Sequence, residues 1–410
     1  MSERTKKILL FSLLAAGTIA LAFLLYFFFK KVAPTAPPTG AGVPTGPAAG
    51  GQFTPAGQRV ATTTAGGAGA QAGLPTAGAI PGVKPSYYQP EPVTKIASEK
   101  VSYFSIGPTG GTRFYNPNDG KFYQVSPDGT SKTLSDQTFY NVKNVTWAPK
   151  NNKAVLEYPD GSKIIYDFEK QKQATLPKHW SEFSFSSDGA EIAAKSVGLS
   201  PENRWLVTVN DDGTGTKLIE PMGENADKVI VDWSPSRQAV AFSMTGNALG
   251  LYRKEVLLIG LNGENFKSLT VEGMGFKPQW SPTGKQLLYS VYSDRSNYKP
   301  ELWLTNSYGQ DIGSGRKNLE LNTWANKCAF SGDETLYCAV PRNLPQGSGI
   351  SPAVADSSYD DFYKVDLKTG LKTLVNISDN YSVDNVSFDQ AGNRLVFTDR
   401  NQSGVFEIKL

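Results

Sequence analysis

Histidine and cysteine are scarce in this chain of 410 residues, which contains one histidine and two cysteines. A single His179 leaves no histidine cluster for a metal ion and only one imidazole for acid–base chemistry. Two cysteines cannot form the disulfide framework of a small secreted domain, and a chain of this length can bury a core without one. The sequence therefore predicts no metal site and no cofactor.

The net charge is also small, because the chain has 41 Lys and Arg residues and 38 Asp and Glu residues, which gives +3. No basic run interleaves with aromatic residues beyond the flanks of the N-terminal apolar stretch, so we predict no nucleic-acid partner. The chain lacks a Gly-x-Ser-x-Gly motif, which excludes the nucleophile elbow of serine hydrolases. Adjacent acidic residues such as Asp360-Asp361 point to opposite faces of a strand. We therefore predict no catalytic residues.

The longest apolar run lies at the N-terminus, over residues 8–29. As a helix it would rise roughly 33 Å, enough to cross a hydrocarbon core about 30 Å thick. The run is longer than a typical signal-peptide core and no small-x-small site follows closely, so an uncleaved anchor is favoured over a cleavable signal peptide. Basic residues flank both ends, and the short tail favours a cytoplasmic N-terminus. We expect residues 1–31 to form a cytoplasmic tail and a single-pass membrane anchor, with the rest of the chain extracytoplasmic.

Residues 32–92 consist mostly of Gly, Pro, Ala and Thr, and their only charges are Arg59, Lys84 and Glu91. Such a segment has too little apolar side-chain area to offset the entropy of ordering it. We expect a disordered linker whose root-mean-square reach is about 40 Å.

A short phrase recurs along the rest of the chain, and Trp280-Ser281-Pro282-Thr283-Gly284 is its clearest copy. An aromatic residue ends one apolar run, a turn reverses the chain, and an alternating apolar run follows, which is typical of a β-hairpin. Related phrases begin at Trp147, Phe185, Trp233, Phe330 and Phe388. A period of about 40 to 55 residues with several strands per unit predicts a radial or solenoid repeat.

Seven units can be laid out over residues 93–410, and the last one ends after its third strand. Residues 93–98, just before the first unit, carry the Lys-x-Ile pattern seen in other fourth strands, such as the segment 131–135. We expect this strand to complete the last sheet and close a ring without an exposed edge. The predicted fold is all-β, a seven-bladed β-propeller preceded by one transmembrane helix and a disordered linker. Six blades are the alternative count.

The phrases at 185–189, 233–235 and 280–284, each followed by an apolar strand, resemble the WD40-like Pro-Asp repeat of TolB-type β-propellers. The resemblance covers roughly residues 93–410 and implies a binding platform or a non-catalytic domain beside a hydrolase. Two function classes follow. The first is a membrane-tethered protein–protein interaction or scaffold module of the cell envelope. The alternative is a hydrolase or lyase that uses carboxylates or tyrosines in the central funnel. The oligomeric state stays open.

The connections between the second and third strands are long in units three to six, over 196–204, 245–254, 293–300 and 341–360. Such connections share one face of a propeller, and long loops on a repeat scaffold are where function concentrates. They carry arginines and tyrosines, the residue types enriched in interface anchors. We expect a protein partner of the cell envelope to dock there, with loop elaboration without a ligand as the alternative. The candidate contact residues are Arg204, Tyr252, Arg253, Arg295, Tyr298, Arg342 and Tyr359.

The two cysteines flank one predicted turn, the Ser331-Gly332-Asp333-Glu334 segment of unit six. Cys328 and Cys338 are placed symmetrically about Asp333, so they should face one another across two neighbouring strands. An extracytoplasmic location permits oxidation, although pairing between adjacent strands constrains the geometry. The pair is a candidate disulfide, with two buried thiols as the alternative.

Overall fold

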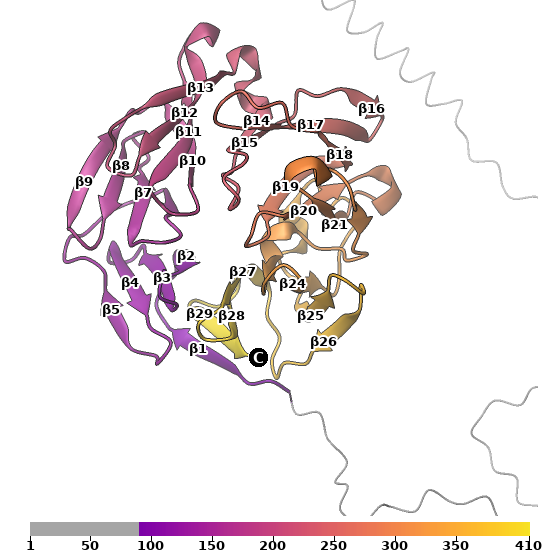
Figure 1. Ribbon diagram of the computed structural model, residues 1–410. Coiled ribbons are helices and arrows are strands. Elements are labelled where there is room, and N and C mark those ends of the chain that lie inside the picture. Colours follow the sequence, from indigo (N-terminus) through magenta and orange to yellow (C-terminus); the bar gives the residue numbers. More distant parts are fainter. Residues whose placement is uncertain (1–89) are drawn as a thin grey trace, which may run out of the picture. The chain divides into compact units, whose positions relative to one another are not determined.

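The computed structural model describes residues 90–410, so the predicted membrane span and most of the predicted linker lie outside the described residues. The described residues form seven antiparallel sheets arranged as a ring (Figure 1). The chain is thus a seven-bladed β-propeller, and the six-bladed alternative is wrong. Within residues 90–410 no helix has the length and apolar character needed to cross a bilayer.

The first three blades follow the chain order of their strands from the inside of the ring outwards. Blade 1 contains β2 (Ser102–Ile106), β3 (Thr112–Asn116), β4 (Lys121–Val125) and β5 (Ser131–Thr133). Blade 2 contains β6 (Asn144–Trp147), β7 (Lys153–Glu157), β8 (Lys163–Asp167) and β9 (Lys172–Leu176). Blade 3 contains β10 (Trp180–Phe185), β11 (Glu191–Val197), β12 (Arg204–Asn210) and β13 (Lys217–Pro221).

Blade 4 departs from the simple pattern by an additional short strand, β16 (Ala248–Gly250), inside a long connection. Its other strands are β14 (Val229–Val231), β15 (Ala241–Ser243), β17 (Arg253–Ile259) and β18 (Leu269–Glu272). Blade 5 contains β19 (Met274–Trp280), β20 (Gln286–Tyr292), β21 (Pro300–Asn306) and β22 (Lys317–Asn318). Blade 6 contains β23 (Cys328–Phe330), β24 (Thr335–Pro341), β25 (Asp360–Asp366) and β26 (Lys372–Val375).

Blade 7 is built from both ends of the described chain. It contains β27 (Val383–Asp389), β28 (Arg394–Asp399), β29 (Val405–Lys409) and, as its outermost strand, β1 (Val93–Ala97). The two end strands are antiparallel, with Val93 opposite Ile408 and Lys95 opposite Phe406. The predicted ring closure is therefore present, and it covers an edge of β29 that would otherwise be open to pairing with another chain.

The core lies between the blades, where the apolar faces of neighbouring sheets meet. Seven clusters of buried residues each join two adjacent blades, so every blade depends on both neighbours. The aromatic residues of the recurring phrase sit in these contacts. Trp280 stacks on Phe242 of blade 4, with ring centroids 5.0 Å apart, and its indole Nε1 donates a hydrogen bond of 3.3 Å to the Asp232 carbonyl. The phrase therefore recurs in blades 2 to 7 because each of them packs this aromatic side chain against the blade before it.

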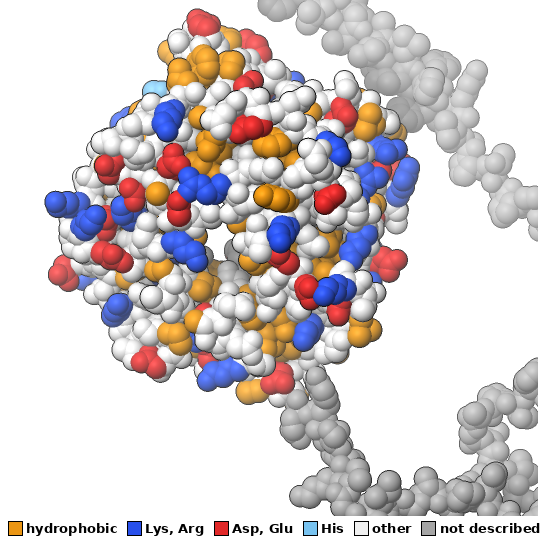
Figure 2. All heavy atoms as spheres, in the orientation of Figure 1, with side chains coloured by type: hydrophobic (Ala, Val, Ile, Leu, Met, Phe, Trp, Pro, Cys, Tyr) orange, Lys and Arg blue, Asp and Glu red, His pale blue; other side chains and the backbone are white. Residues whose placement is uncertain are grey.

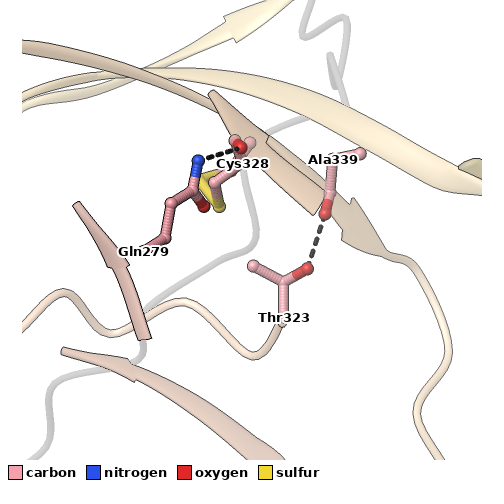
Figure 3. The surroundings of a disulfide bond; sticks show 5 residues. Gln279, Thr323, Cys328 and Ala339 are labelled. Carbon is pink, nitrogen blue, oxygen red and sulfur yellow. Dashed lines mark hydrogen bonds between the residues drawn. A yellow bond between two sulfur atoms is a disulfide. The ribbon is translucent and has the colours of Figure 1, made fainter. Parts of the chain in front are cut away.

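A disulfide joins the first two strands of blade 6 (Figure 3). Cys328 and Cys338 are direct cross-strand partners with Cα atoms 4.1 Å apart, and both side chains are buried. Gln279 of blade 5 donates its amide Nε2 to the Cys328 carbonyl at 3.2 Å. The cysteines therefore face one another as the symmetric spacing about the turn predicts, and the structure places the bridge in the contact between blades 5 and 6.

Candidate functional site

Four long connections between second and third strands lie on one side of the ring, which we call the loop face. They span residues 198–203, 244–252, 293–299 and 342–359 in blades 3 to 6. Because the strands of each blade alternate in direction, the connections from one blade to the next lie on this same side. The loops contain short elements of their own, η1 (Pro201–Asn203), β16, η3 (Asp294–Ser296) and η6 (Pro352–Ala355).

The loops of blades 4, 5 and 6 are hydrogen-bonded to one another. The hydroxyl groups of Tyr252 and Tyr298 lie 3.1 Å apart, and this hydrogen bond raises the pKa of Tyr252 to about 12. The backbone N–H of Gly349 donates to the Tyr298 carbonyl at 2.7 Å, and that of Gly347 donates to the Asn297 carbonyl at 3.0 Å. Three blades therefore present one connected surface rather than separate loop tips.

Three of the candidate arginines hold the loops in place through intramolecular contacts. Arg204 donates to the Gly198 carbonyl at 3.2 Å and pairs with Glu224 at 3.3 Å. Arg253 pairs with Glu272 at 3.2 Å, and Arg342 pairs with Asp361 at 2.7 Å. All three side chains lie at least partly in solvent.

The other two candidates are open to solvent. The exposed side chain of Arg295 makes no hydrogen bond or ion pair with any part of the chain between residues 90 and 410. Tyr359 is 47% exposed. The structure therefore brings Tyr252 and Tyr298 together, pairs Arg253 with Glu272, and leaves Arg295 and Tyr359 exposed on the same face.

Exposed apolar side chains occur on the loop face in each of blades 3 to 6. Leu199 is fully exposed and Leu251 is 86% exposed. The further members are Leu249, Met274, Ile350 and Val354. Sequence reasoning missed these residues because it searched the loops for arginine and tyrosine, although apolar residues inside a polar loop are a readable signal. The 342–359 loop has a small core of its own, formed by Trp324, Leu344 and Ala355, which fixes its shape.

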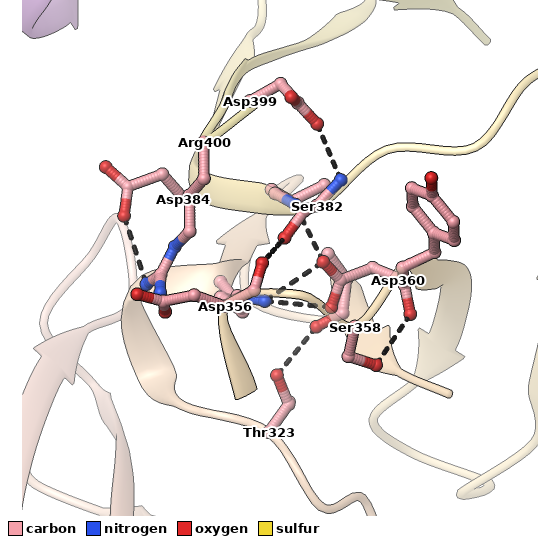
Figure 4. Close-up of polar contacts among 12 residues, drawn as sticks. Thr323, Asp356, Ser358, Asp360, Ser382, Asp384, Asp399 and Arg400 are labelled. Atoms are coloured by element: carbon pink, nitrogen blue, oxygen red, sulfur yellow. Dashed lines mark hydrogen bonds and ion pairs between the residues drawn. The ribbon is translucent and has the colours of Figure 1, made fainter. Parts of the chain in front are cut away.

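A polar cluster with a buried ion pair lies beneath the loop face between blades 6 and 7 (Figure 4). The ammonium group of Lys327 lies 2.9 and 3.0 Å from the two carboxylate oxygens of Asp360. Asp360 also accepts the backbone N–H of Val383 at 2.7 Å. Nearby, Arg400 contacts both Asp356 and Asp384. These contacts tie the start of β25 to the inner strand of the next blade.

A polar cavity of about 530 Å³ lies at the centre of the ring, where Figure 2 shows an opening. It is lined by inner-strand residues of blades 1, 5, 6 and 7, among them Tyr103, Gln279 and Asp384. Burial raises the pKa of the Asp384 carboxyl and of the Tyr103 hydroxyl. Tyr103 adopts a left-handed backbone conformation, with φ of 53°, and its hydroxyl donates to the Lys143 carbonyl. Both side chains therefore already have partners, since Arg400 pairs with Asp384 at 3.2 Å.

The lone histidine lies away from these groups, before β10. His179 Nε2 is 3.1 Å from the Ser196 hydroxyl in an exposed position. Among residues 90–410, no three His, Cys, Asp or Glu side chains are grouped as metal ligands.

The fold defines the chain as a closed seven-bladed β-propeller. No protein-family model matches the sequence, and no curated protein matches it. Among solved structures, the chain resembles the Cps50 (Swd1) β-propeller domain of Myceliophteria thermophila, with a TM-score of 0.53, 10% identity, and coverage of 78% of this chain and 99% of that one. It also resembles an oligogalacturonate lyase in complex with manganese, with a TM-score of 0.52, 12% identity, and coverage of 78% and 93%.

TolB from Acinetobacter baumannii is a further structural match, with a TM-score of 0.43, 13% identity, and coverage of 69% of this chain and 64% of that one. At these identities the similarities show the propeller fold alone.

Proposed function

We propose that this propeller is a protein–protein interaction module of the cell envelope, tethered to the membrane by residues 1–31, and that its partner docks on the loop face of blades 3 to 6. The observation that carries the proposal is the exposure of apolar side chains on that face, where Leu199 and Leu251 are the most exposed large apolar residues between positions 90 and 410. Side chains such as Leu251 and Ile350 remain in water, so they do not gain the favourable free energy of burial. A bound partner would cover them.

The composition of the face supports a protein as the partner. Apolar residues are flanked by Tyr252, Tyr298 and Arg295, and aromatic residues and arginine are the types that dominate binding energy at protein interfaces. The hydrogen bonds between the loops also support docking, because a surface that is already ordered loses less entropy when it binds.

Site-specific photo-crosslinking in native membranes tests this proposal. A photoreactive amino acid at position 199, 251 or 350 is expected to capture one common partner. The matched controls are positions 308 and 371, where Tyr308 and Leu371 are exposed apolar residues on the opposite side of the ring. Equal capture from both sides, or capture from the control positions alone, would remove the loop face as the docking site.

The second candidate is an enzyme of the central cavity, a hydrolase or lyase. The raised pKa values of Asp384 and Tyr103 favour it, because perturbed ionisation in a cavity is a common property of catalytic groups. The structural neighbour named as an oligogalacturonate lyase suggests an acidic oligosaccharide as the first substrate to assay. Cleavage of oligogalacturonate by the purified chain, lost in Asp384→Asn, would support this candidate over the interaction module.

A further inference from the structure

A small cavity lies on the loop face between blades 5 and 6, separate from the central one. Its volume is about 170 Å³, below the range of about 300 to 1,000 Å³ typical of small-molecule sites. Its size therefore suits one amino-acid residue rather than a cofactor. Apolar surface is supplied by Tyr292 on β20, Trp324 before η5 (Ala325–Lys327), and Ile350 of the 342–359 loop.

Two polar side chains in its wall have no partner. Lys277 on β19 is the cross-strand partner of Ser290 on β20, so both side chains project from the same face of the sheet. Ser290 is 2% exposed, and its hydroxyl has no hydrogen-bond partner. The exposed ammonium group of Lys277 makes no ion pair or hydrogen bond within residues 90–410. A buried hydroxyl beside a free cation is an arrangement that an anion would complete.

The backbone around the cavity is shaped by two glycines that contact Tyr292. A Cβ atom at Gly275, where φ is +68°, would overlap the Tyr292 ring. A Cβ atom at Gly349 would lie 2.5 Å from the Tyr292 Cβ atom and 2.7 Å from the Tyr298 carbonyl oxygen. The 342–359 loop can therefore close against blade 5 only because Gly349 lacks a side chain, and Gly275 leaves room for the Tyr292 ring within blade 5. The hydrogen bond from Gly349 to Tyr298 holds it there.

We propose that this cavity binds the C-terminal residue of the partner. The terminal carboxylate is bound by the Lys277 ammonium group and the Ser290 hydroxyl, and an apolar last side chain packs on Trp324 and Ile350. An internal Asp or Glu would supply a carboxylate but leave the apolar walls unfilled. An uncharged apolar side chain would leave Lys277 and Ser290 unpaired. Among the groups that a protein partner offers, a chain terminus with an apolar last residue satisfies both parts of the cavity.

This inference rests on the proposed function, because it assigns part of the docking surface. It is tested with two fluorescein-labelled hexapeptides of identical sequence ending in phenylalanine, one with a free carboxylate and one with a C-terminal amide. Fluorescence anisotropy with the purified full-length protein is expected to show at least tenfold tighter binding of the carboxylate peptide, the size expected for a charge-assisted hydrogen bond.

Lys277→Met and Ser290→Ala are each expected to weaken the binding of the carboxylate peptide. Lys277→Met should leave the affinity for the amide peptide nearly unchanged. Lys285→Met, an exposed lysine at the opposite end of the blade 5 hairpin, is the matched control and should bind like the unmodified protein. The inference would be overturned if the unmodified protein bound the two peptides equally or bound neither saturably. It would also be overturned if Lys277→Met lost affinity for both peptides to the same extent.

The photo-crosslinking experiment separates this inference from the proposed function. Partner capture from position 251 in a protein that does not distinguish the two peptides would overturn the carboxylate site and leave the docking face in place. Loss of capture from every loop-face position would overturn the docking face itself.

Discussion

Lys327 and Asp360 form an ion pair that is buried on both sides, with the ammonium nitrogen 2.9 Å from the nearer carboxylate oxygen and side-chain exposures of 4% and 0%. Burial lowers the pKa of Lys327 and raises the pKa of Asp360. Desolvation therefore opposes both charges, and it is offset by their attraction for each other and by the hydrogen bond that Asp360 accepts from the Val383 N–H. The pair joins the connection before β23 to the start of β25, directly beneath the loop face.

Lys327→Met is expected to lower the free energy of unfolding by about 3 to 5 kcal/mol, because it leaves the Asp360 carboxylate buried without its cation. Chemical denaturation measures the effect. The control is Lys178→Met, which breaks the exposed pair with Asp160 and should change stability by less than about 1 kcal/mol. Equal losses in the two variants would mean that the Lys327 pair is not buried in solution.

The carboxyl group of Asp232 is expected to make the free energy of unfolding depend on pH. Burial raises the pKa of this carboxyl from 3.8 to about 7, so the folded state holds its proton more tightly than the unfolded state. The free energy of unfolding therefore falls as pH rises from about 4 to about 7, because the unfolded chain loses the proton first. Asp232→Asn should flatten this fall. Asp128→Asn should leave the fall unchanged, because Asp128 lies at an exposed turn where the hydrogen bond from the Thr130 backbone N–H lowers its pKa. Parallel pH profiles of the unmodified protein and Asp232→Asn would contradict the assignment.

Deleting residues 93–98 should lower the melting temperature by about 2 to 4 °C for each kcal/mol of lost stability, because β29 becomes an open edge. Calorimetry measures the shift. A deletion of the same length within the predicted linker, over residues 60–65, is the control and should leave the transition unchanged. An unaltered melting temperature after the first deletion would show that ring closure does not contribute to stability.

The double variant Cys328→Ala and Cys338→Ala should lower the free energy of unfolding by about 2 to 3 kcal/mol, the loop-closure entropy expected for a bridge across 10 residues. Mass spectrometry after alkylation without reduction gives an independent check. Unmodified cysteines are expected, whereas alkylation of both under denaturing conditions would show two free thiols.

The sequence was sufficient to predict those features that repeat or that lie close together in the chain. The seven units, the closing strand and the facing of Cys328 and Cys338 follow from a recurring phrase, a missing fourth strand and symmetry about one turn. The Lys327–Asp360 pair and the Lys277–Ser290 cavity could not be predicted, because their surroundings come from different loops and blades that no periodicity relates. The position of β16 was missed for a similar reason, since a short strand in a long connection has no apolar alternation of its own.

The proposed docking of a partner on the loop face of blades 3 to 6 is tested by removing several contacts of that face at once. The variant shortens the 342–359 loop and carries Tyr252→Ala and Tyr298→Ala, and a control carries Tyr308→Ala and Leu371→Ala on the opposite side. Partners are crosslinked in native membranes and quantified by mass spectrometry, with the melting temperature confirming that each ring is folded. We expect the loop-face variant to lose the partner that the control retains. An unchanged set of partners in a folded loop-face variant would show that the partner does not dock on the loop face.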